Sequence, residues 1–169
     1  MREDGPEAVL RFLDDLRAAE TAGAEVLAAW IAVCGLDGLR GGLRAIGERE
    51  AAHAELLEER VHELGGTCTA AVAEAVRAAA LACFGSPAMA DEEKLALLLG
   101  RYPDDTAAAR PILAVCGALA GDPETQELLR LIAEGEGATV AWLRAYQSGL
   151  RPATAPALPR PGDINLESY

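Results

Sequence analysis

The chain has 169 residues with 27 acidic and 15 basic side chains, a formal net charge of −12, and only two histidines. This length favours one domain whose core is large enough to fold without disulfides or a structural metal. The acid excess argues against nucleic acid and anionic membranes as partners, because both are bound through Lys and Arg. Abundant Ala, Leu, Glu and Arg, with few β-branched and aromatic residues, predict an all-α fold.

Glycine and proline residues separate the helices that the apolar period predicts. The predicted ranges, in chain order, are 6–34, 39–64, 69–84, 91–119 and 123–147. Pro103 and Pro111 should kink or restart the fourth helix, because proline lacks the backbone N–H that a helix needs. Two helix pairs joined by one long crossover, which contains a short extra helix, predict an antiparallel four-helix bundle over residues 1–147. The Pro-rich residues 148–169 are expected to form an extended or disordered tail.

The cysteines and the N-terminal sequence indicate the cellular compartment in which the protein is expected. The four cysteines form no Cys-x-x-Cys pair, so we expect reduced, mostly buried thiols rather than a zinc or redox motif at Cys34, Cys68, Cys83 and Cys116. No basic start precedes an apolar run, and no stretch of about 18 apolar residues occurs, so neither a signal peptide nor a membrane span is expected. These features predict a cytoplasmic protein.

Each long predicted helix carries a carboxylate near the middle of an otherwise apolar stripe. A carboxylate at such a position costs several kcal/mol unless it is paired or binds a metal. In two antiparallel helices, residues equally far from the connecting turn lie at the same height along the bundle axis. These side chains should therefore meet at the bundle centre. There they must bind cations, take up protons or contact water. The polar stripe residues are Glu20, Glu50, His53, Asp105, Glu136 and Thr139.

Glu50 and His53 form a Glu-x-x-His motif. Residues three apart share one face of a helix, so both side chains can reach one metal ion. Carboxylate and imidazole ligands suit Fe, Mn or Zn rather than a soft metal. The stripes therefore predict a metal site inside the bundle, with Glu20, Glu50, His53, Asp105 and Glu136 as candidate ligands.

Over roughly residues 6–147, this pattern resembles the ferritin-like superfamily, including bacterioferritins and rubrerythrin-type proteins. That family has a Glu on helices one and three and Glu-x-x-His on helices two and four. Glu20 matches the first position, Glu50 and His53 match the second, and Glu136 matches the fourth. The resemblance implies iron as the metal, with manganese or zinc as alternatives. It also implies ferroxidase or small-molecule oxidase chemistry of the diiron carboxylate type, and a homo-oligomer.

The chain departs from the family pattern at two positions. Thr139 stands where the second motif has histidine, and Asp105 stands where helix three has glutamate. The other histidine, His62, lies off the face of His53, so one chain cannot supply a symmetric two-histidine centre. One metal position keeps the ligands Glu20, Glu50 and His53, whereas the second rests on Asp105, Glu136 and water.

Each candidate has a structural alternative. Glu20 is solvated if the apolar stripe is rotated by one position. For His53 the alternative is a hydrogen-bonded core histidine that binds no metal. Asp105 follows Pro103 and suits a helix N-cap. Glu136 stands between two glycines, each of which costs a helix about 1 kcal/mol relative to alanine.

Two alternative functions remain open beside iron redox chemistry. A degenerate bundle without catalysis would act as a structural or protein-interaction module. The tail, ending in residues 163–169, would tether a recognition peptide for a protein partner, as in encapsulin cargo proteins that resemble ferritins. An ordinary frayed terminus is the alternative interpretation of that tail.

Overall fold

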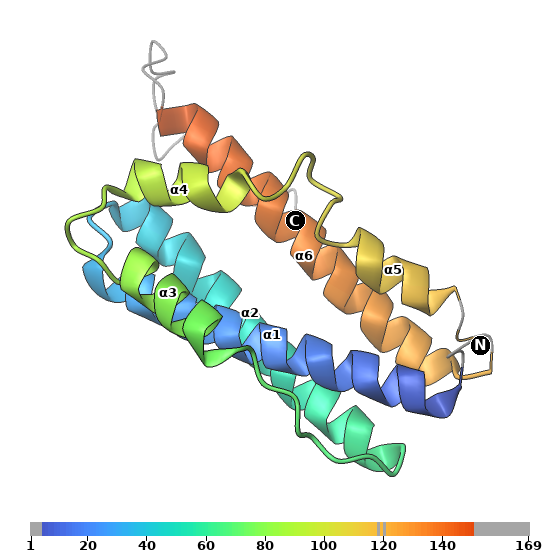
Figure 1. The fold of residues 1–169 in the computed structure, drawn as a ribbon. Helices are drawn as coiled ribbons and strands as arrows, with labels where there is room; N and C mark the ends of the chain where they lie inside the picture. The colour runs from blue at the N-terminus through green and yellow to red at the C-terminus, as the bar shows by residue number, and fades with distance from the viewer. Residues whose placement is uncertain (1–4, 118, 120, 151–169) are drawn as a thin grey trace, which may run out of the picture.

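The computed structural model describes residues 5–117, 119 and 121–150, and within them the chain forms six α-helices and no strand (Figure 1). The all-α prediction is confirmed for this part of the chain. None of these helices has both the length and the apolar character that crossing a membrane requires. The helices are α1 (Pro6–Val33), α2 (Asp37–Glu63), α3 (Glu74–Phe84), α4 (Asp91–Leu99), α5 (Arg110–Cys116) and α6 (Pro123–Leu150).

Helices α1 and α2 form a long antiparallel hairpin (Figure 1). Pro6 is in the first turn of α1, where its missing N–H leaves no hydrogen bond unmade. At the far end, α2 stops because Gly65 adopts a φ of 80°, which residues with a side chain rarely reach. The Gly66 N–H then donates to the Val61 carbonyl at 2.8 Å and closes the helix end.

Helices α4 and α5 lie one after the other along α6, in place of the single helix expected over 91–119 (Figure 1). Residues 100–109 between them are turns and bends. Pro103 stands in this interval and Pro111 in the first turn of α5, so the chain restarts its helix where proline requires it. The three long helices α1, α2 and α6 are consistent with a bundle whose remaining side is made of two short pieces.

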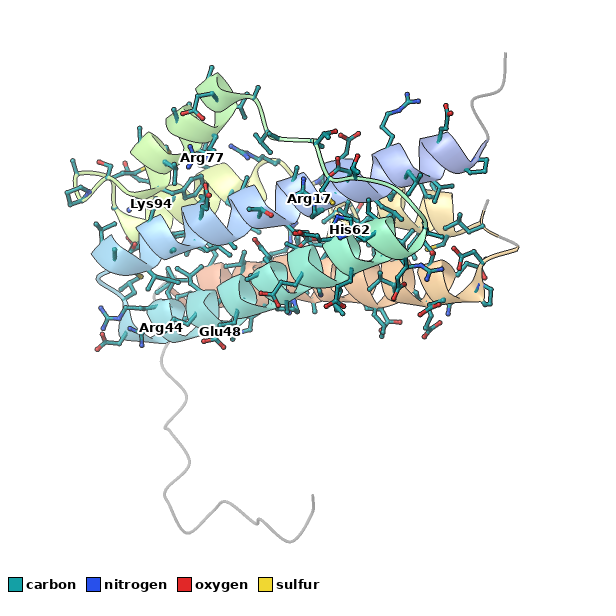
Figure 2. All side chains as sticks on the ribbon, turned by 90° about the horizontal axis from the view of Figure 1, so that it is seen from below. Arg17, Arg44, Glu48, His62, Arg77 and Lys94 are labelled. Atoms are coloured by element: carbon teal, nitrogen blue, oxygen red, sulfur yellow. The ribbon has the colours of Figure 1, made fainter. Side chains whose placement is uncertain are left out.

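The crossover from α2 to α4 returns along α1 and carries α3 (Figure 1). Asp14 is buried on α1 and accepts hydrogen bonds from the backbone N–H groups of Thr69 and Ala70, both at 2.7 Å. Arg17, labelled in Figure 2, donates to the Asp14 carboxylate at 2.8 Å and to the Ala70 carbonyl at 2.8 Å. A buried carboxylate with three donors therefore fixes the start of the crossover.

A second buried carboxylate fixes the end of the crossover. Asp91 begins α4 and accepts hydrogen bonds from the Trp30 indole at 2.7 Å and from the Gly35 N–H at 2.8 Å. Both donors belong to the end of the first hairpin helix and its turn. Trp30 also packs against Phe84 of α3, with 5.3 Å between ring centroids. The two ends of the crossover are thus tied to the two halves of the α1 helix and to the turn that follows it.

The apolar core divides into two clusters along the bundle. One surrounds Trp30, Leu43 and Leu143, and the other surrounds Leu13 and Leu129. The polar stripe residues of α1, α2 and α6 fall in the interval between these clusters.

The described residues also test two smaller expectations. All four cysteines are free, with Cys34 and Cys116 buried and the other two half-buried. Residues 148–150 continue α6 instead of beginning the tail. The rest of the predicted tail, residues 151–169, lies outside the described residues.

Candidate metal centre

Three helices bring one carboxylate, one imidazole and a second carboxylate together inside the bundle. Glu20 of α1, His53 of α2 and Glu136 of α6 offer ligand atoms that all lie within 4.8 Å of one another. Glu20 is 5% exposed and His53 is 8% exposed. The Nδ1 atom of His53 lies 3.2 Å from Oε2 of Glu20. A buried group of carboxylate and imidazole atoms this close together could hold a metal ion.

Glu136 completes this group with an oxygen that has no protein partner. Its Oε1 atom is buried and makes no hydrogen bond within the described part of the chain. Burial, together with the neighbouring Glu20 carboxylate, raises the pKa of Glu136 to about 7, although Arg49 and His53 oppose the shift. A bound cation would satisfy this oxygen and remove the repulsion between the two carboxylates.

Glu50 lies beside the group rather than within it. Its carboxylate occupies space left by Gly23 of α1, where an added Cβ would stand 2.2 Å from Oε2 of Glu50. Burial, together with the charges of Glu136 and Glu20, raises the pKa of Glu50 to about 8. These surroundings favour the protonated form of Glu50 in the absence of a metal.

Arg49 contacts Thr139, the residue at which the resemblance stated above implied a second histidine ligand. Its Nη2 atom donates a hydrogen bond to the hydroxyl of Thr139, which is buried on α6. Gly135 leaves room for it, because a Cβ there would lie 3.1 Å from both Arg49 Nε and His53 Cε1. The guanidinium lowers the pKa of Glu50 and Glu136 against the effect of burial.

The apolar period did not single out Arg49, although one signal for it was available. Arg49 precedes His53 by four residues, and this spacing puts both side chains on one face of α2. A stripe with several carboxylates and one imidazole also needs a positive charge. The two observations together would have pointed to Arg49.

The structure does not bring Asp105 into the group. Its carboxylate is half-exposed and accepts a hydrogen bond from Nε of Arg144 at 2.7 Å. The reason is the break between α4 and α5, because the helical period predicts the direction of a side chain only where the backbone is helical. The capping alternative does not apply to Asp105 either, because the neighbouring Asp104 accepts the Thr106 N–H at 3.0 Å.

A cavity of about 650 Å³ opens onto the same residues. All six helices and the segment between α4 and α5 contribute to its walls, and Glu20, Glu50 and Glu136 line it together with many apolar side chains. The candidate metal centre is therefore next to a space larger than a few water molecules.

Comparison with known proteins assigns no family. No protein-family model matches the chain, and no curated protein is significantly similar to it. What is established is an all-helical protein with a buried Glu/His/Glu group.

Proposed function

We propose that the protein binds one transition-metal ion through Glu20, His53 and Glu136, and that this ion is iron used for redox chemistry. The unpartnered, buried Oε1 of Glu136 beside the other two ligands is the observation that carries the proposal. A buried polar atom of this kind normally has a partner, and a cation is the partner that this donor set prefers. Manganese and zinc are the alternatives. The proposal takes the bundle as ferritin-like, with α4 and α5 together as its interrupted helix.

The contacts of Arg49 favour a single metal ion over a diiron pair. A second ion would need ligands near Thr139 and Asp105, but the Thr139 hydroxyl accepts from Arg49 and Asp105 pairs with Arg144. A guanidinium at this place also repels a second cation. We therefore propose a mononuclear centre, with Glu50 near enough to join as a further ligand after losing its proton.

The roles of the chain's own residues follow from this arrangement. When bound, iron would supply one-electron chemistry toward oxygen or a peroxide. Glu20, His53 and Glu136 hold the ion, Arg49 balances part of the carboxylate charge, and the two apolar clusters flank the site along the bundle.

Metal analysis of protein purified without chelator and loaded with Fe²⁺ under anaerobic conditions tests the proposal. We expect about one ion per wild-type chain and almost none in the Glu20→Ala, His53→Ala double variant. His62→Ala and Glu48→Gln are the matched controls, because both residues are exposed on α2 (Figure 2). Stoichiometric iron in the double variant, with the helical circular dichroism signal intact, contradicts the site.

The second candidate is a metal-free interaction module, and the positive charge of Arg49 among the carboxylates is the observation in its favour. A ligand that binds only the folded state must stabilise it. Adding Fe²⁺, Mn²⁺ or Zn²⁺ should therefore raise the melting temperature of the wild-type chain but not of the double variant. No rise with any of the three ions would favour the interaction module. The homo-oligomer implied by the resemblance also stays a proposal, to be tested by sedimentation velocity.

A further inference from the structure

We infer that the cavity beside Glu20, His53 and Glu136 binds an elongated apolar monoanion, such as a medium-chain carboxylic acid, with its apolar end toward the metal centre. The inference deepens the proposed function, because it names the class of substrate that would reach the metal. It depends on the proposed function only for what happens at the metal. The binding itself needs the cavity alone.

The size and walls of the cavity suit an organic ligand. Its volume of about 650 Å³ lies within the range of roughly 300–1,000 Å³ that small-molecule sites occupy. The polar groups are few, and Glu20, Glu50 and Glu136 gather on the wall shared with the metal centre. Large apolar side chains form much of the remaining wall, including Phe12, Leu16, Val26, Phe84, Leu98 and Ile112.

The interruption of the helix between α4 and α5 builds one side of this space. Residues 100–109 carry Arg101, Tyr102, Ala107 and Ala108 to the cavity wall. A continuous helix through this interval would make its own backbone hydrogen bonds and pack against α6. Residues 100–109 do not form these helical turns, and a cavity lies at this place instead. The cavity is therefore a consequence of the backbone path.

The charges at the cavity determine how a ligand would lie. Arg77 and Arg101 both line the cavity, but Arg77 is held by Glu25 at 2.6 Å and by Glu74 at 3.2 Å. Arg101 is exposed, and its guanidinium forms no ion pair with any carboxylate among residues 5–117, 119 and 121–150. An exposed cation at the rim attracts an anionic group, and Arg is the side chain best suited to a carboxylate.

Other carboxylates on the cavity wall repel an anion. Glu20 and Glu136 both line the cavity, and the positive charges of Arg49 and His53 offset only part of their effect on Glu136. A ligand with one charged end therefore binds with that end at Arg101 and its apolar body between α1 and α6. This orientation brings carbon atoms, rather than the charged group, to the metal centre.

Calorimetry of the metal-free, full-length chain with dodecanoate, dodecanol and dodecylammonium tests the inference, each used below its micelle concentration. We expect saturable binding of about one dodecanoate per chain, with at least tenfold weaker binding of dodecylammonium. Arg101→Gln should weaken dodecanoate about tenfold and leave dodecanol unchanged. Arg44→Gln, at an exposed arginine of α2 (Figure 2), is the matched control.

A bulky residue inside the cavity should abolish binding, whereas the same residue outside should not. Ala80 lines the cavity on α3, and its neighbour Ala79 is exposed and does not. We expect Ala80→Phe to lose dodecanoate and Ala79→Phe to keep it. Ala107→Phe gives a second filled variant if Ala80→Phe fails to fold, as judged by its circular dichroism and melting temperature.

Several results would overturn the inference. They are absence of saturable binding to the full-length chain, equal affinity in Ala80→Phe, Ala107→Phe and Ala79→Phe, and tighter binding of dodecylammonium than dodecanoate. Equal loss of dodecanol and dodecanoate in Arg101→Gln would contradict the orientation. Dodecanoate binding by a wild-type chain that takes up no iron keeps the cavity site and contradicts the metal centre. Iron uptake by the wild-type chain without any dodecanoate binding contradicts the cavity site and keeps the metal centre.

Discussion

Arg49 donates a hydrogen bond to the hydroxyl of Thr139 and thereby connects α2 to α6 beside three carboxylates. Two helices that each bring a buried acidic residue to the centre repel one another there. The guanidinium offsets that repulsion within the protein itself. A side chain of the protein thus supplies positive charge beside the buried carboxylates.

Replacing the hydrogen bond between Arg49 and Thr139 by a histidine ligand should create a second metal position. Thr139→His alone should not raise the iron content above about one ion per chain, because Arg49 still occupies the space. The double variant Arg49→Leu, Thr139→His should bind about two ions through Glu50, Glu136 and the new imidazole. Anaerobic Fe²⁺ titration with metal analysis measures both. A doubled content in the single Thr139→His variant would contradict the role given to Arg49.

Removing the charge of Arg49 should destabilise the metal-free protein. Arg49→Leu leaves Glu50 and Glu136 without the cation that lowers their pKa values, so we expect a loss of about 2 kcal/mol in the free energy of unfolding by urea. Fe²⁺ should restore much of this loss. Arg44→Leu, at an exposed position one turn earlier in α2, should change stability by no more than about 0.5 kcal/mol. Equal effects of the two variants would contradict the prediction.

Two adjacent glycines of α2 should respond in opposite directions to alanine. A Cβ at Gly42 would lie 2.0 Å from the Trp142 ring of α6, whereas a Cβ at Gly41 has no atom within 4 Å. Gly42→Ala must therefore displace the indole, and we expect a loss of about 2 kcal/mol. Gly41→Ala should gain about 0.5–1 kcal/mol, because alanine favours the helix. Thermal unfolding of both variants checks this, and a stabilised Gly42→Ala would mean that α2 and α6 are not in this contact.

Asp14 should give the stability of the protein a defined pH dependence. Burial alone would raise the pKa of Asp14, but the N–H groups of Thr69 and Ala70 and the Arg17 guanidinium outweigh it, so its pKa is lowered in the folded state. The resulting stabilisation is fully present above the unfolded pKa of about 4 and is lost as pH falls through the folded value. Asp14→Asn should therefore lower the melting temperature at neutral pH.

The gap in melting temperature between wild type and Asp14→Asn should close below about pH 4. Asp15→Asn, at the neighbouring exposed acid, is the control and should leave the profile almost unchanged. A gap that stays constant down to pH 2 would show that the carboxylate charge contributes nothing.

The helical period was sufficient to predict the long helices and the inward direction of their polar residues. Because α1, α2 and α6 are regular, counting in threes and fours placed Glu20, His53 and Glu136 correctly on their inner faces, and the structure brings the three together. Their binding of a metal, and that of Glu50, stays a prediction.

The same counting did not apply to the interval between α4 and α5. Asp105 shares a stripe with buried residues only if residues 100–109 are helical, and they are not. Arg49 and the cavity depend on how side chains from different helices fill space, which a one-dimensional period does not describe. Gly23 and Gly135 make room for Glu50 and Arg49, yet in the sequence they resemble only weak points of a helix.

The non-helical interval 100–109 makes local opening of the structure distinct from its global unfolding. Its few backbone hydrogen bonds are local turns, such as Ala107 N–H to Asp104 carbonyl at 3.2 Å, whereas α1, α2 and α6 carry long uninterrupted ladders. Segments of this kind open with a small fraction of the global unfolding free energy. We therefore expect amide protons of residues 100–109 to exchange faster than those of α1, α2 and α6, and small solutes to reach the buried carboxylates through openings of this segment. Access to the centre and the lifetime of the fold are then set by different parts of the chain.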